Sequence, residues 1–184
     1  MLMPLGLLSQ GGGAAGGSFE QIETQILGST TASITFSSIP STYKHLQVRI
    51  TARTTDALDL GGVAFRFNSD SGSNYTYHIV GMNDATAENL AGSSQTSGLF
   101  GSVTGNTSTA SSFGVVVADI MDYANTSKNK VVRSLSGYTS ATTRYRLIGS
   151  AWISTSAVTS LTVLDNIGGS FATGSRFTLY GIKG

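Results

Sequence analysis

The sequence has no cysteine, two prolines and one tryptophan among its 184 residues, and only 11% of those residues are charged. Without cysteine there is neither a disulfide framework nor a thiolate zinc site, so packing and assembly must supply the stability. No apolar run approaches the ~20 residues of a transmembrane helix, and we therefore expect no membrane span. The eleven lysines and arginines are scattered and the formal net charge is +1. This pattern argues against nucleic acid as a partner.

Motifs that carry chemistry are also lacking. There is no G-x-S-x-G elbow for a nucleophilic serine, and His45 and His78 fall in different predicted strands without metal-ligand spacing. Residues 68–72 imitate the start of a calcium loop, but Ile79 stands where the bidentate glutamate belongs, which favours an Asx-type turn. We predict a protein that is not an enzyme and that has no catalytic residues, metal site or cofactor.

What the chain does contain is many short segments that are typical of β-strands, with 23 glycines and dense serine and threonine between them. The clearest is the run 44–53, in which Leu46, Val48 and Ile50 alternate with polar residues at the period of two of a half-buried strand. We predict core positions at Leu46, Val48, Ile50, Phe65, Phe67, Leu147 and Leu161.

The spacing of these segments predicts one all-β domain over residues 19–184, an antiparallel β-sandwich with little helix. We expect the first two segments, 19–27 and 31–39, to form a hairpin, and residues 82–112 to form a long irregular loop. The predicted strands are 19–27, 31–39, 44–53, 63–68, 74–80, 113–121, 130–138, 144–153, 158–164 and 176–182.

Two of these strands suggest contacts with other chains. The strand 113–121 is apolar on both faces, so it is either central and covered on both sides or covered on one side by another subunit. In the strand 144–153 the face that contains Tyr145 and Leu147 has the composition of a core face. Arg144, Arg146 and Trp152 then lie on the outward face, where they form a candidate interface, unless the tryptophan is simply covered within the sandwich.

Residues 1–18 are expected to form an extended N-terminal arm. The glycine-rich stretch 11–17 acts as a tether that reaches on the order of 55–60 Å when the arm is extended. No lysine or arginine precedes Lys44, which argues against a secretory signal. We predict that the apolar tip contacts another chain, through Met1, Leu2, Met3, Leu5, Leu7 and Leu8.

Four segments, SSIPSTYKHLQVRITART, FRFNSDSGSNYTYHIVG, DIMDYANTSKNKVVRSLSGY and RFTLYGIKG, resemble small structural proteins of tailed bacteriophages. The MPLG start and the glycine-rich linker add to this resemblance, which spans most of residues 19–184 and carries no catalytic motif. It implies a virion component with a jelly-roll-like β-sandwich. Its implied partners are the major capsid protein and sister copies in a homo-oligomer, with a trimer favoured.

The resemblance leaves two positions in the virion open. The first hypothesis is a capsid cement or decoration protein that stabilises the head through its sandwich and its arm. The second is a tail fibre or tail adaptor module that binds the host surface, with residues 82–112 as a possible contact for glycans. A glycan-cleaving enzyme is the third hypothesis, but the ten carboxylates show no paired pattern.

Overall fold

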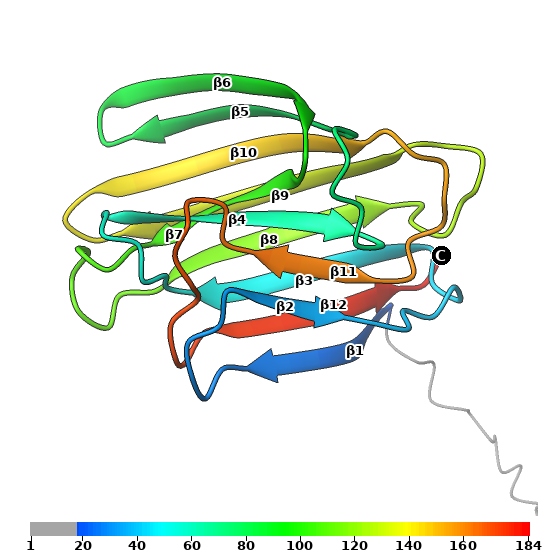
Figure 1. Cartoon of the computed structure of the whole chain (residues 1–184), viewed down its shortest axis with the longest axis horizontal. Coiled ribbons are helices and arrows are strands. Elements are labelled where there is room, and N and C mark those ends of the chain that lie inside the picture. The colour runs from blue at the N-terminus through cyan, green and yellow to red at the C-terminus, as the bar shows by residue number, and fades with distance from the viewer. Residues whose placement is uncertain (1–17) are drawn as a thin grey trace, which may run out of the picture.

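The computed structural model describes residues 18–184, and these residues form β-strands without any helix that could cross a membrane (Figure 1). The predicted arm therefore lies outside the described residues, apart from Ser18. The strands are β1 (Phe19–Ile26), β2 (Ser33–Phe36), β3 (His45–Ala52), β4 (Leu60–Phe67), β5 (Tyr75–Asn83), β6 (Thr86–Gln95), β7 (Gly98–Thr104), β8 (Gly114–Met121), β9 (Lys130–Thr139), β10 (Thr143–Trp152), β11 (Leu161–Leu164) and β12 (Arg176–Ile182).

Two antiparallel sheets pack face to face. The large sheet has eight strands in the order β1-β12-β3-β8-β9-β10-β5-β6, and the small sheet has four in the order β2-β11-β4-β7. The connections β1–β2, β3–β4, β7–β8 and β11–β12 each pass from one sheet to the other, which is the jelly-roll arrangement. The hairpins β5–β6 and β9–β10 extend the large sheet, and β5–β6 forms its far end (Figure 1). The predicted antiparallel sandwich of jelly-roll type is thus confirmed.

The core lies between the two sheets and follows the alternation that the sequence predicts. Leu46 and Val48 of β3 are fully buried, as are the facing Phe65 and Phe67 of β4. The ring of Phe65 stacks on that of Phe100 with centroids 4.4 Å apart. Burial confirms six of the predicted core positions, which are Leu46, Val48, Ile50, Phe65, Phe67 and Leu161.

The predicted orientation of β10 is wrong. Trp152 is only 3% exposed and points into the sandwich, whereas Leu147 is 52% exposed and is not a core residue. The indole Nε1–H donates to Asp70 Oδ2 at 2.6 Å, so the polar end of Trp152 is satisfied while its ring packs 5.6 Å from that of Phe67. Arg144 and Arg146 lie on the same inner face as Trp152, where both pair with the carboxylate of Glu88.

The predicted hairpin of segments 19–27 and 31–39 is also wrong, because these segments enter different sheets. β1 pairs with β12 and β2 pairs with β11. Each partner comes from the C-terminal part of the chain, and no local turn signal reports such a pairing. The turn at residues 28–32 carries the chain from the large sheet to the small one.

Residues 82–112 are not one irregular loop, since they contain β6 and β7. Every residue of β7 is buried. The longest connection in this part of the chain is 105–113, between β7 and β8. The guanidinium of Arg53 holds this loop by donating to the carbonyls of Asn106, Ser108, Thr109 and Ser112.

Candidate interaction surface on the large sheet

One face of the large sheet packs on the small sheet, and the opposite face carries exposed apolar side chains. Across β8, β9, β10 and β5 the register places Val117, Leu135, Leu147 and Val80 in one row. The adjacent row contains Val115, Gly137, Tyr145 and Met82. These two rows form what we term the outer apolar face, defined by Val80, Met82, Val115, Val117, Leu135, Tyr145 and Leu147, which are 40–60% exposed.

The outer apolar face is hollowed in two places. One hollow of about 490 Å³ lies between Val117, Leu135 and Leu147 and reaches the Asp119–Arg133 pair. A second, of about 320 Å³, shares Val117 and Leu135 and is bounded by Tyr145. Both hollows are shallow depressions in a sheet surface, and they suit protruding apolar side chains of a partner rather than an enclosed ligand.

The charged residues next to this face neutralise each other. Arg133 Nη2 lies 2.9 Å from Asp119 Oδ2 across β8 and β9, and Gln47 Nε2 donates to Asp119 Oδ1 at 2.8 Å. Burial alone would raise the pKa of Asp119, but the hydrogen bonds from Gln47 and Arg133 and the positive charge of Arg133 hold it below its ordinary value. The carboxylate is therefore ionised at neutral pH and the pair carries no net charge.

The surface changes character toward β3 and β12. Here the guanidinium of Arg49 lies over the rings of Tyr180 and Phe19, at 4.8 and 5.7 Å from their centroids. A depression at this position is lined mainly by polar side chains, including Thr51 and Arg176. The outer apolar face thus ends at β8 on one side.

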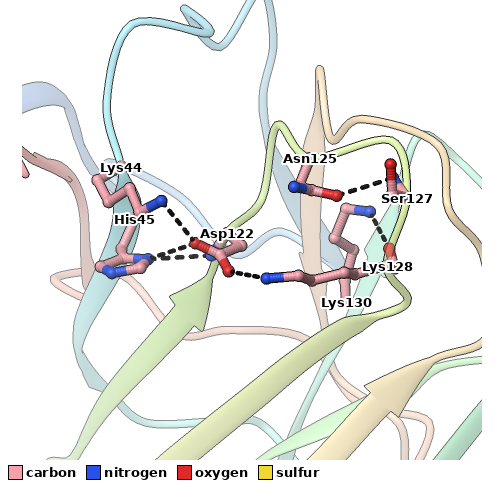
Figure 2. A network of polar contacts seen from close by, with 7 residues as sticks. All are labelled: Lys44, His45, Asp122, Asn125, Ser127, Lys128 and Lys130. Carbon is pink, nitrogen blue, oxygen red and sulfur yellow. Dashed lines mark hydrogen bonds and ion pairs between the residues drawn. The ribbon is translucent and has the colours of Figure 1, made fainter.

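A polar network fixes the turn between β8 and β9 (Figure 2). The carboxylate of Asp122 lies 3.0 Å from Lys128 Nζ, 3.4 Å from Lys44 Nζ and 3.6 Å from His45 Nδ1. The backbone N–H of Asp122 donates to His45 Nδ1 at 3.0 Å, so this nitrogen acts as an acceptor. The hydrogen bond from Lys128 lowers the pKa of Asp122, and the nearby lysine charges add to the effect. The hydrogen bonds and charges of these groups are thus paired with one another, and the pairing anchors the turn to the start of β3.

Lys130 in the same network is fully buried. Its amine donates to the carbonyls of Lys128 at 2.7 Å and Thr155 at 3.1 Å. Burial lowers the pKa of Lys130. The side chain joins the β8–β9 turn to the segment that follows β10, and we assign it a structural role.

A second charged cluster lies on the inner face, where the hairpin β5–β6 meets β10. Arg146 donates to Glu88 through Nε at 2.8 Å and Nη2 at 3.0 Å, and Arg144 Nη2 lies 3.7 Å from the same carboxylate. The hydrogen bonds from Arg146 lower the pKa of Glu88 against the effect of burial. Gly81 lies between the two partners in the register, and a Cβ there would lie 3.1 Å from Arg146 Cγ and 2.2 Å from Tyr145 O. The glycine leaves room for the arginine to cross β5.

The structure separates the sequence-predicted interface residues into two groups. Arg144, Arg146 and Trp152 lie on the inner face, so the prediction that they form an outward face is wrong. The arm residues Met1, Leu2, Met3, Leu5, Leu7 and Leu8 lie outside the described residues. The sequence interpretation missed Leu135, Tyr145 and Leu147 as surface residues. The available signal was the apolar composition of both faces of segment 113–121.

Within residues 18–184 no group of three or more histidine, aspartate or glutamate side chains converges to hold a metal ion. The segment that imitates a calcium loop is instead an Asx turn, as predicted, because Gly72 N–H donates to Asp70 Oδ1 at 2.8 Å. The other oxygen of Asp70 accepts from Trp152 and from Asn74 Nδ2. Hydrogen bonds from these three donors, that from Trp152 first, lower the pKa of Asp70.

Comparisons with protein-family models, curated proteins and solved structures gave no match.

Proposed function

We propose that this chain is a non-enzymatic structural protein of a bacteriophage virion, acting as a cement or decoration protein on the capsid. The observation that carries this proposal is the outer apolar face, which has seven apolar side chains at 40–60% exposure in two adjacent rows. Exposed apolar patches of this extent on a soluble domain mark sites of association. The jelly-roll body and the resemblance to small phage structural proteins support the same role.

The energetic logic of a cement protein is the addition of buried area to a shell. Burial of apolar surface contributes about 25 cal/mol per Å², so a face that is half-exposed in the single copy stabilises whatever assembly covers it. The apolar sequence of residues 1–8, on its glycine-rich tether, adds a second adhesive element. In this proposal the partners are the major capsid protein and sister copies of the chain.

The test uses phage particles that lack the protein. Purified full-length protein is added back, its position is determined by electron cryo-microscopy, and the temperature at which the heads release DNA is compared with and without it. We expect density on the outer shell and release at a higher temperature. Density confined to the tail would replace the cement role with the tail fibre or adaptor role, and absence from both would contradict the virion role itself.

A further inference from the structure

We propose that a second copy of this chain covers the outer apolar face, so that two large sheets pack against each other about a two-fold axis and form a dimer in place of the trimer that the resemblance implies. The inference deepens the proposed function by naming the partner of this face. The place of the dimer in a virion rests on that proposed function. The outer apolar face itself is observed in a single copy and does not depend on it.

The first argument is the composition of β8. Its inner side chains Val116 and Ile120 are at most 1% exposed, as expected next to the small sheet. Its outer side chains Val115 and Val117 are equally apolar but 51% and 41% exposed. Strands that are apolar on both sides are typical of sheets that are covered on both faces. Two such faces pack about 10 Å apart with interdigitating side chains, and the hollows beside Leu135 provide the receiving space.

The second argument is size. Residues of this kind at about half exposure each present on the order of 80 Å². With Met121 and Val131, which are 43% and 53% exposed on the same side of β8 and β9, the face presents on the order of 700 Å², close to the ~800 Å² per partner of a standard interface. Polar residues flank it, with Arg49 beside Val117 on β3 and His78 on β5, as at the edges of other protein interfaces.

The third argument is charge. Asp119 and Arg133 form an ion pair within one copy, so the face has no excess charge that requires an oppositely charged partner. About a two-fold axis that runs beside this pair, Asp119 of each copy can approach Arg133 of the other, and the pattern is then complementary to itself. A second copy therefore fits this surface without leaving a charge unpaired.

We place the two-fold axis near Leu135. Leu135 lies between Val117 and Leu147 in its row and is the most exposed residue of the outer apolar face, at 60%. In a two-fold contact a residue near the axis meets the same residue of the other copy. Leu135 should therefore lie near its counterpart.

The absence of native cysteine makes this directly testable in the full-length chain. The variant Leu135→Cys is oxidised mildly and the rate of disulfide-linked dimer formation is measured. The matched control is Ile26→Cys, whose site is 64% exposed on edge strand β1 and away from the face. We expect linkage of Leu135→Cys at least tenfold faster than that of the control. Equal rates would overturn the proposal.

A second measurement is the mass in solution by light scattering. The unmodified chain and Ile26→Asp should both have the mass of a dimer. Leu135→Asp should have the mass of a monomer, and its circular dichroism spectrum should show that it is folded. A monomeric unmodified chain, or an oligomer that survives Leu135→Asp, would overturn the inference. So would a disulfide that forms only when Leu5→Cys is combined with Leu135→Cys, because the arm would then occupy the face. A dimer that does not bind particles would contradict the proposed function alone, and a monomer that binds heads would contradict only this inference.

Discussion

The ion pair between Arg146 and Glu88 gives the sharpest prediction about stability. The side chains are only 11% and 14% exposed, and two N–H groups of the guanidinium donate to the two carboxylate oxygens. The substitution Glu88→Gln keeps the shape but removes the charge and replaces one acceptor with an NH₂ group that faces the guanidinium. Charge-assisted hydrogen bonds contribute ~1.5–3 kcal/mol each, and a buried ion left without its partner costs more, so we expect a loss of about 2–4 kcal/mol in the free energy of unfolding at pH 7. Urea denaturation measures this loss.

The pH dependence provides an independent check. The folded-state pKa of Glu88 lies below its unfolded value, so its contribution is fully present above the unfolded pKa and is lost as the pH falls through the folded pKa. The difference between the unmodified chain and Glu88→Gln should therefore be complete above about pH 5 and should shrink as the pH falls below the unfolded pKa of glutamate.

The matched control is Glu20→Gln. Glu20 Oε2 lies 2.9 Å from Lys183 Nζ, at a distance similar to that of the buried pair, but the two side chains are 50% and 47% exposed. Water and salt screen such a pair, and we expect no measurable loss. Equal effects of the two substitutions, or a Glu88→Gln effect that does not change with pH, would refute the assignment of stability to the buried pair.

Three further predictions address the core, a buried carboxylate and the arm. Val48→Ala should lower the free energy of unfolding by about 2–4 kcal/mol, because it leaves a cavity in the fully buried core. Arg49→Ala, on the opposite side of β3, should lower it by less than about 1 kcal/mol. A larger loss for Arg49→Ala than for Val48→Ala in urea denaturation would contradict the assignment of the two faces. Burial, with the neighbouring Asp165 carboxylate, raises the pKa of Asp56, so its charged form destabilises the fold as the pH rises through that pKa. Asp56→Asn retains an acceptor for Thr54 Oγ1 and should raise the melting temperature by about 2–4 °C at pH 7 but not at pH 3, and a decrease at pH 7 would contradict this. Deletion of residues 1–17 should leave the circular dichroism spectrum unchanged and reduce occupancy on particles, and equal occupancy and equal heat resistance would exclude the arm from attachment.

The sequence was sufficient where one side of a strand differs chemically from the other. In β3, Leu46 and Val48 alternate with Gln47 and Arg49, and the structure buries the apolar set. In β10 both sides mix apolar and polar residues, so alternation could not decide which side faces the core. The deciding contacts, Trp152 with Asp70 and Arg146 with Glu88, join segments that are 82 and 58 residues apart.

The tract 82–112 shows how tertiary packing overrides local propensity. Its glycine, serine and asparagine content disfavours strands, yet β7 is buried throughout because it is the strand of the small sheet that packs over β9 and β10.

The outer apolar face was only partly predictable from the sequence. The apolar composition of both faces of β8 indicated that its outer face also packs against something. That Leu135 and Leu147 belong to the same surface depends on the strand register, which only the folded sheet reveals.

The pairing of β1 with β12 has a consequence for biosynthesis. Phe19 pairs with Ile182, so the first strand of the domain finds its partner β12 in the large sheet when the last strand has been made. Until then the side of β3 that pairs with β12 is also open. Contacts between such distant segments form slowly, and unpaired strands are prone to aggregate. We therefore expect nascent chains to remain sensitive to proteases on the ribosome until β12 has emerged, and expression of this protein to depend more on chaperones that shield nascent chains than on the final stability of the fold.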